Sequence, residues 1–251
     1  MCLILAAWDA HPDFKLVVAS NRDEFFERTS LPMHWWDDVP VLAGRDQTAG
    51  GSWMTLSADG RFAAVTNVRD FTRPDAAKRS RGEIPVRFSA GDDSPADYCR
   101  GLPADEYTGY NALVTDLQSL WWTSNWAGAA LPLDAGVYGV SNAALDTPWP
   151  KVVAGKQRFA DALASGAGVQ DFFAVLADDA VAPDELLPDT GVGLELERLV
   201  SPAFISSPDY GTTASTVLRI GGDGSYDVEE RRFLQGEETG RVTFTGRLTR
   251  G

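Results

Sequence analysis

The chain has 251 residues, a formal net charge of −14 from 36 acidic and 22 basic side chains, and 44% hydrophobic residues. Such an acidic surface is unsuited to nucleic acid or to an anionic membrane, because both attract clustered lysine and arginine. The length and hydrophobic content suit a single domain over residues 1–251 with one large core.

The sequence contains neither a run of about 20 uncharged apolar residues typical of a membrane span nor a basic segment and apolar run typical of a signal peptide. We therefore expect a cytoplasmic protein in which Cys2 and Cys99 stay reduced. The excess of Asp over Glu and the few lysines resemble a halophile protein, in which high salt screens like charges from one another. The sequence indicates no oligomeric state.

Cys2 begins an apolar run over residues 2–8 that predicts a buried strand. If Met1 is removed, Cys2 becomes the amino terminus and carries a free α-amine beside its thiol. An amine with a pKa near ~7.7 can accept the proton of a thiol with a pKa near ~8.5, so one residue would supply both nucleophile and base. The alternative is a small buried side chain, because free cysteine is often found in protein interiors.

A second strand is expected over residues 14–20, and it ends in the polar cluster Ser20-Asn21-Arg22-Asp23-Glu24. We expect a short helix over residues 21–28. After an apolar run at 41–46 and the pair Gly50-Gly51, the dipeptide Asp59-Gly60 predicts a hairpin over residues 53–67 that ends at Asn67. The glycine pair indicates a tight backbone path or room for a substrate.

In the rest of the chain, segments with the hydrophobic pattern of strands alternate with segments that have the pattern of helices. A polar, arginine-rich loop is followed by weak helical signals over 83–102. A second hairpin (110–115 and 120–124), a strand (136–142), helices (151–164 and 171–177), an ambiguous segment (183–200) and three final strands (215–220, 226–233 and 241–247) follow. This order favours an α+β fold of two antiparallel sheets packed face to face with helices outside.

Several motifs, in order, resemble the NRDE protein family, the transport-and-Golgi-organisation homologues, over nearly the whole chain. They are Met1-Cys2-Leu3, Asn21-Arg22-Asp23-Glu24, Gly44-Arg45-Asp46, Gly50-Gly51-Ser52-Trp53, Thr66-Asn67, Tyr138-Gly139-Val140-Ser141-Asn142, Pro148-Trp149-Pro150-Lys151, Tyr210-Gly211-Thr212 and Ser215-Thr216-Val217-Leu218. The resemblance implies membership of the N-terminal-nucleophile hydrolase superfamily and its four-layer αββα sandwich.

Resemblance to the cysteine branch of that superfamily, which includes conjugated bile salt hydrolases and penicillin acylases, implies catalytic roles. Cys2 would be the nucleophile, in a cleft that Asn21 and Asp23 help to rim, and Asp23 would hold the α-amine. Asn67 and Asn142 would donate hydrogen bonds to the oxyanion, a task that suits a neutral amide. The structural alternatives are a helix N-terminal carboxylate for Asp23 and local backbone hydrogen bonds for the two asparagines.

Arg22, Arg45 and Trp53 are candidate substrate-binding residues. Both arginines could instead brace the loops by pairing with nearby carboxylates. Two positions depart from the patterns: Ser20 stands where the cysteine hydrolases usually carry an arginine, and Thr213 where the NRDE pattern often has one.

These features predict an amidohydrolase that cleaves a small acylated substrate through an acyl-thioester on Cys2, with no cofactor or metal. The alternative function is that of a non-catalytic carrier of haem or a lipid, since relatives in the family that this chain resembles have been linked to haem movement and lipid metabolism. Tryptophans would then offer apolar faces, and His11 or His34 would ligate haem iron. A third reading is a catalytically idle interaction surface, with Cys2 deeply buried and unreactive.

Overall fold

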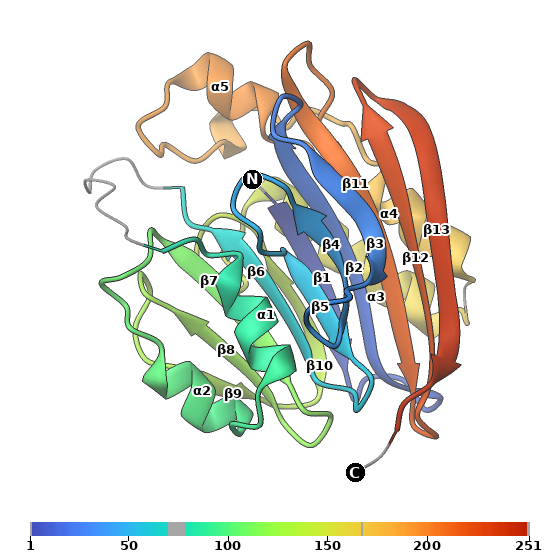
Figure 1. The fold of residues 1–251 in the computed structure, drawn as a ribbon. Helices are drawn as coiled ribbons and strands as arrows, with labels where there is room; N and C mark the ends of the chain where they lie inside the picture. The colour runs from blue at the N-terminus through green and yellow to red at the C-terminus, as the bar shows by residue number, and fades with distance from the viewer. Residues whose placement is uncertain (1, 70–78, 167, 250–251) are drawn as a thin grey trace.

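The computed structural model describes residues 2–69, 79–166 and 168–249, which form two antiparallel sheets packed face to face (Figure 1). In the described chain one sheet has six strands, ordered β10 (Gly136–Val140), β1 (Cys2–Trp8), β2 (Phe14–Phe25), β11 (Tyr210–Gly221), β12 (Ser225–Leu234) and β13 (Glu237–Arg247). The other has seven, β3 (Ser30–Trp35), β4 (Val41–Asp46), β5 (Met54–Ser57), β6 (Phe62–Asn67), β7 (Tyr110–Thr115), β8 (Leu120–Ser124) and β9 (Leu131–Leu133).

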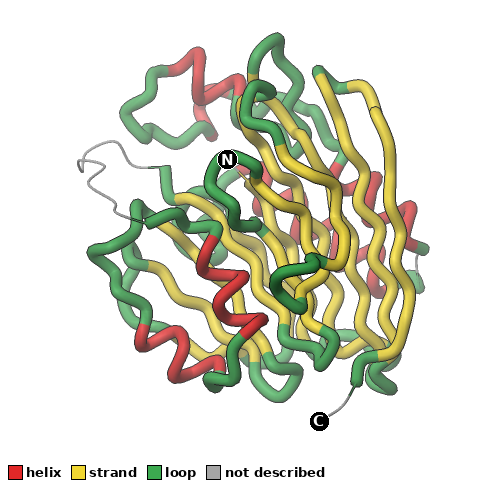
Figure 2. Tube along the Cα trace, in the orientation of Figure 1, coloured by secondary structure: helices red, strands yellow, loops and turns green. Residues whose placement is uncertain are grey.

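Helices cover the outer face of each sheet, as Figure 2 shows. The seven-stranded sheet carries α1 (Glu83–Ala90) and α2 (Pro95–Gly101), and the six-stranded sheet carries α3 (Pro150–Ala164) and α4 (Val169–Leu176). The four layers confirm the predicted αββα sandwich. A short 3-10 helix (Asp184–Leu186) and α5 (Leu194–Leu199) follow. Within the described residues, no helix is long and apolar enough to cross a membrane.

Strand alternation separates the core into layers. On β1, Ile4, Ala6 and Trp8 pack between the sheets, whereas Leu3 and Leu5 pack against the helices of the outer layer. Successive side chains of a strand point to opposite faces, so a strand covered on both faces must be apolar throughout. This explains why the segment at 2–8 is a continuous apolar run. A third cluster fills the space under α1 and α2.

The predicted hairpins, the strand near 136–142 and the helices near 151–164 and 171–177 are confirmed. The predicted helix over residues 21–28 is wrong. Strand β2 continues to Phe25 because β11 pairs with it there, with Thr212 opposite Asp23 and Gly211 opposite Glu24. The apolar run at 41–46, for which no element was predicted, forms β4. Most of the arginine-rich loop, residues 70–78, lies outside the described residues.

Gly51 allows the close approach of two backbone segments beside the site. Its neighbour Ser52 donates its N–H to the carbonyl oxygen of Gly82 at 3.0 Å. A Cβ atom on Gly51 would lie 2.4 Å from the carbonyl carbon of Gly82, closer than van der Waals contact permits. The tight backbone path inferred from the glycine pair is therefore present.

We predict that Gly51→Ala lowers the free energy of unfolding by about 1–3 kcal/mol, because the new methyl group forces one backbone segment to move. Urea denaturation followed by tryptophan fluorescence measures this. Gly240→Ala is the matched control, because a Cβ atom there meets nothing within 4 Å. Equal midpoints for the two variants would contradict the proposed contact.

Candidate active site

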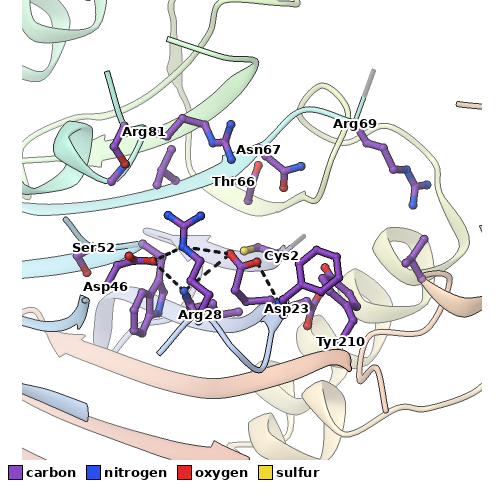
Figure 3. Close-up of a pocket in the computed structure, with 18 of the residues that line it drawn as sticks. Cys2, Asp23, Arg28, Asp46, Ser52, Thr66, Asn67, Arg69, Arg81 and Tyr210 are labelled. Carbon is purple, nitrogen blue, oxygen red and sulfur yellow. Dashed lines mark hydrogen bonds and ion pairs between the residues drawn. The ribbon is translucent and has the colours of Figure 1, made fainter. Parts of the chain in front are cut away.

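A cavity of about 460 Å³ lies where the ends of the two sheets meet near Cys2 (Figure 3). The six-stranded sheet contributes Cys2, Arg22 and Asp23 to its wall, and the seven-stranded sheet contributes Asn67. The wall also includes Leu196, from α5. The cavity is therefore built from strand ends of both sheets and from one helix of a connecting segment.

Cys2 is half-buried at the start of β1, directly opposite Arg22 on β2. Its carbonyl oxygen accepts a hydrogen bond from Ser141 Oγ at 2.8 Å, which joins β1 to the end of β10. Burial raises the pKa of the Cys2 thiol, and the Asp23 carboxylate raises it further, whereas the Asp23 backbone N–H lowers it. Both cysteines are free thiols, and burial raises the pKa of Cys99 to about 12.

Asp23 lies two residues beyond Asn21 on β2, and its Oδ1 accepts a hydrogen bond from Thr212 Oγ1 at 2.8 Å. Burial raises the pKa of this carboxyl group, and Lys151 is the charge that most opposes the rise. Because Asp23 belongs to a strand, the alternative of a carboxylate at a helix N-terminus is wrong.

Asn67 and Asn142 contact each other, but only Asn67 lines the cavity. Asn142 is fully buried, and its Nδ2 donates to Asn67 Oδ1 at 2.7 Å and to the Asn67 carbonyl oxygen at 3.2 Å. With Oδ1 of Asn67 accepting from Asn142, the Nδ2 group of Asn67 is left to donate elsewhere. The prediction that Asn142 rims the cleft is wrong: it lies behind Asn67 and fixes that side chain.

Two further candidates lie away from the cavity wall. Asn21 is fully buried on the face of β2 that the helix layer covers, where its Nδ2 donates to the carbonyl oxygens of Leu176 and Ala203 at 2.8 Å each. Arg45 donates two hydrogen bonds to the Asp38 carboxylate, at 2.7 and 2.8 Å, and packs over the Trp36 ring. Asn21 therefore does not rim the cleft, and Arg45 has the carboxylate pairing that was the structural alternative for it.

Arg22 and Trp53 do line the cavity, and they contact each other across the sheets. The guanidinium lies 4.7 Å from the centre of the Trp53 ring, and Nη2 donates to Asp46 Oδ2 at 3.0 Å. Nη1 donates to Thr213 Oγ1 at 3.0 Å. Hydrogen bonds to Asp46 and Thr213 thus hold Arg22 in place at the cavity.

Several residues of this region were not predicted from the sequence. Leu196 and Leu199, in the segment left ambiguous, give the cavity an apolar side. Tyr210 also lines it, and burial raises the pKa of its phenol. The motif Tyr210-Gly211-Thr212 was the available signal for Tyr210 and for the partner of Asp23. Lys151, from the motif Pro148-Trp149-Pro150-Lys151, is buried, and its Nζ donates to the Val200 carbonyl oxygen at 3.0 Å.

The two histidines considered as haem ligands are not part of the cavity wall. His11 precedes β2 and lies 3.2 Å from the Asp13 backbone nitrogen, and His34 Nδ1 lies 2.8 Å from the Pro32 carbonyl oxygen. Among the described residues, no group of three or more His, Cys, Asp or Glu side chains is arranged to hold a metal ion.

Comparisons with known proteins agree with this architecture. The family described as Transport and Golgi organisation 2 matches residues 1–235. The Transport and Golgi organization protein 2 homologs of Bos taurus and Homo sapiens are 31% and 30% identical to the chain, which each alignment covers to 98%, together with 98% and 99% of the relative. A mutant of the conjugated bile acid hydrolase from Clostridium perfringens has a similar fold, with a TM-score of 0.54 at 10% identity, over 98% of this chain and 92% of that one.

In a chain that keeps Met1, which lies outside the described residues, we predict slow alkylation of Cys2 at pH 7. Burial raises the thiol pKa, so the thiolate forms only above the value of ~8.5 for free cysteine. Iodoacetamide labelling at a series of pH values, read by peptide mass, gives the midpoint. Cys99, with its pKa near 12, is the internal control and stays largely unlabelled. A midpoint below 8 for Cys2 would contradict the prediction.

Proposed function

The chain belongs to the Transport and Golgi organisation 2 family, and from its fold and cavity we propose that it is an amidohydrolase whose nucleophile is the Cys2 thiol. The observation that carries this proposal is the meeting of Cys2, Asp23 and Asn67 at one cavity between the sheets. A thiol, a carboxylate and an amide donor are the groups that acyl transfer requires. The likeness to a bile acid hydrolase supports the fold on which this chemistry would take place.

The proposed reaction begins once Met1 has been removed. The α-amine of Cys2 takes the proton from the thiol, and the thiolate attacks the acyl carbon of the substrate. A C–S bond forms, the C–N bond breaks, and the ammonium group gives its proton to the departing amine. Water then attacks the thioester, with the α-amine accepting its proton, and the carboxylic acid and the free thiol are released.

Asp23 and Asn67 would assist different stages of this reaction. A carboxylate beside the α-amine stabilises its protonated form and orients it toward the leaving group. The Nδ2 group of Asn67 would donate to the oxyanion that forms on the carbonyl oxygen. Asn142 would act indirectly. Its Nδ2 donates to Asn67 Oδ1, and this hydrogen bond fixes the orientation of the Asn67 amide, so that the Nδ2 group of Asn67 is directed away from Asn142.

The cavity wall suits a small substrate with an apolar acyl group. Trp53, Leu196 and Leu199 supply apolar surface, and the volume of about 460 Å³ is within the range of small-molecule sites. No histidine is among the residues that line this cavity within the described chain, so neither His11 nor His34 would ligate a haem bound there. Cys2 and Tyr210 do line the cavity, and both types of side chain can ligate haem iron. The choice of an acyl amide over haem therefore rests on the meeting of Cys2, Asp23 and Asn67.

We predict that protein beginning at Cys2 forms a covalent acyl adduct when incubated with a panel of N-acyl amides of different acyl length. Intact mass spectrometry after acid quenching detects the adduct, and Cys2→Ala abolishes it because the acyl acceptor is gone. Cys99→Ala is the matched control and keeps the adduct. Absence of both adduct and turnover across the panel would contradict the proposal and favour a ligand carrier.

Asn67→Asp is expected to lower kcat by about 10²–10³-fold, because the side chain keeps its shape and its bond from Asn142 but loses its donor. Asn142→Ala should have a smaller effect on kcat, since the Nδ2 donor of Asn67 remains and only the hydrogen bond that orients the Asn67 side chain is lost. Steady-state kinetics on whichever amide reacts provides the test. An unchanged kcat in Asn67→Asp would exclude Asn67 as the oxyanion donor.

We also predict that the protein isolated from its own host begins at Cys2, because a residue as small as cysteine permits removal of the methionine before it. The adjacent ammonium group then stabilises the thiolate and lowers the thiol pKa relative to the chain that keeps Met1. Mass spectrometry of the native amino terminus decides the first point, and comparison of the two labelling midpoints decides the second. If Met1 is retained, ligand binding ranks above hydrolysis.

A further inference from the structure

The cavity around Cys2 has two chemically different ends (Figure 3). Asp46 and Ser52 lie at one end, where the Asp46 carboxylate accepts hydrogen bonds from two arginine side chains. Arg69 and Tyr210 lie at the other end, on the opposite side of Cys2. The first end is therefore polar and charged, and the chemistry of the second depends on the side chains that accompany Arg69 and Tyr210.

The second end is lined by apolar side chains from the end of β2, the start of β11 and α5. The Phe25 ring lies 5.1 Å from the Tyr210 ring, and both residues line the cavity. From α5, Leu196 and Leu199 line it too, although they are 38% and 37% exposed. Large apolar side chains that stay in contact with water at a cavity gain free energy when a ligand covers them. This end therefore offers apolar surface that a substrate can bury.

A buried ion pair places α5 at this end of the cavity. Glu197 stands between the two leucines, and its Oε2 lies 2.7 Å from Arg69 Nη2, with each of the two side chains 4% exposed. Glu197 Oε1 accepts the backbone N–H of Thr190 at 2.9 Å, and the Val200 carbonyl oxygen accepts Lys151 Nζ at 3.0 Å. A helix of six residues is not stable by itself, so these contacts fix its position.

The arginine of this ion pair belongs to the segment that carries the proposed oxyanion donor. Arg69 follows Asn67 by two residues, and its backbone N–H donates to the Asn142 carbonyl oxygen at 2.7 Å. Asn142 in turn donates to Asn67 Oδ1. The Arg69 guanidinium also lies 4.6 Å from the centre of the Trp149 ring. The position of α5 is thus fixed relative to the side chain proposed to bind the oxyanion.

We propose that Leu196 and Leu199 are specificity-determining residues that bind an aliphatic acyl chain, and that the Arg69–Glu197 ion pair positions them. The chain then runs from Cys2 toward α5, and the substrate class is an amide of an aliphatic acid. The inference deepens the proposed function and rests on it for its catalytic meaning. Because a chain along these leucines leaves water, each added methylene group should tighten binding by about 3–4-fold.

Calorimetric titration of protein that carries Cys2→Ala measures this binding without turnover. The ligands are N-acyl glycinamides with butyryl, hexanoyl, octanoyl or decanoyl chains. In that background we expect Leu196→Ala and Leu199→Ala to weaken octanoyl binding by about 5–10-fold and butyryl binding by less than about 2-fold, because only the longer chain reaches the truncated side chains. Leu194→Ala is the matched control: it is on the same helix and 47% exposed, but it is not among the described residues that line the cavity.

Glu197→Gln tests the positioning role, because it keeps the shape of the side chain and removes its charge. We expect octanoyl binding to weaken by about 3–10-fold, since α5 is released, and butyryl binding to stay nearly unchanged. Glu195→Gln is the matched control on the same helix: its side chain is 89% exposed and pairs with Arg198, a surface contact of little energetic weight. Equal affinities in the two variants would overturn the positioning role of the ion pair. If circular dichroism shows that Glu197→Gln does not fold, the two leucine variants decide.

The same increase of affinity with chain length in Leu196→Ala, Leu199→Ala and the Leu194→Ala control would overturn the proposal, as would absence of binding by every chain. Acylation of Cys2 is measured separately, so this test and the test of hydrolysis fail separately. An increase that the leucine variants abolish, without acylation by any amide, would refute the hydrolase and leave the acyl-chain site intact. Normal acylation with the same increase in all three variants would refute only the role of α5.

Discussion

The pairing of β1 with β2, which sets Cys2 opposite Arg22, is the constraint on which the candidate site depends. Because side chains alternate along a strand, this register sends Arg22 to the inter-sheet face and Asn21 to the helix face. A shift of one residue would exchange these faces and bury Arg22 among the apolar side chains under α3 and α4. The apolar residues of β1, which are buried on both faces, fix the register energetically.

Polar contacts between the two sheets then hold the cavity open at this end of the sandwich. On one side, the ion pair of Arg22 with Asp46 joins β2 to β4. On the other, Asn142 donates to Asn67, and Thr66 Oγ1 donates to the Ser141 carbonyl oxygen at 2.6 Å, which joins the end of β10 to β6. Buried polar groups are stable only when paired, so these contacts specify one arrangement of the two sheets. The shape of the cavity follows from them rather than from apolar packing alone.

The sequence was sufficient to predict the layers and most elements, because buried strands and amphipathic helices have clear periodicities. It also predicted Cys2, Arg22, Asp23, Trp53 and Asn67 as neighbours, and all five line one cavity. It failed where tertiary contacts decide: the polar segment after Ser20 remains a strand because β11 pairs with it. The side chain of Asn21 was wrongly predicted to rim the cleft for the same reason. In a helix over residues 21–28, the alternation of a strand would not have directed this side chain to the helix-covered face of the sheet. Lys151 belongs to one of the motifs, but nothing near it in the sequence predicts its burial, because its hydrogen-bond partner Val200 follows α5, 49 residues further along the chain.

In the proposed reaction the Cys2 thiol, Asp23 and Asn67 act on one acyl group. A crystal structure of protein that begins at Cys2, alkylated by an acyl-mimicking chloromethyl ketone, would show all three groups around the bound carbonyl. We expect a carbonyl oxygen within about 3 Å of Asn67 Nδ2 and an α-amine within hydrogen-bonding distance of Asp23. An adduct on Cys2 whose carbonyl oxygen faces away from Asn67, with the α-amine bound elsewhere, would contradict it.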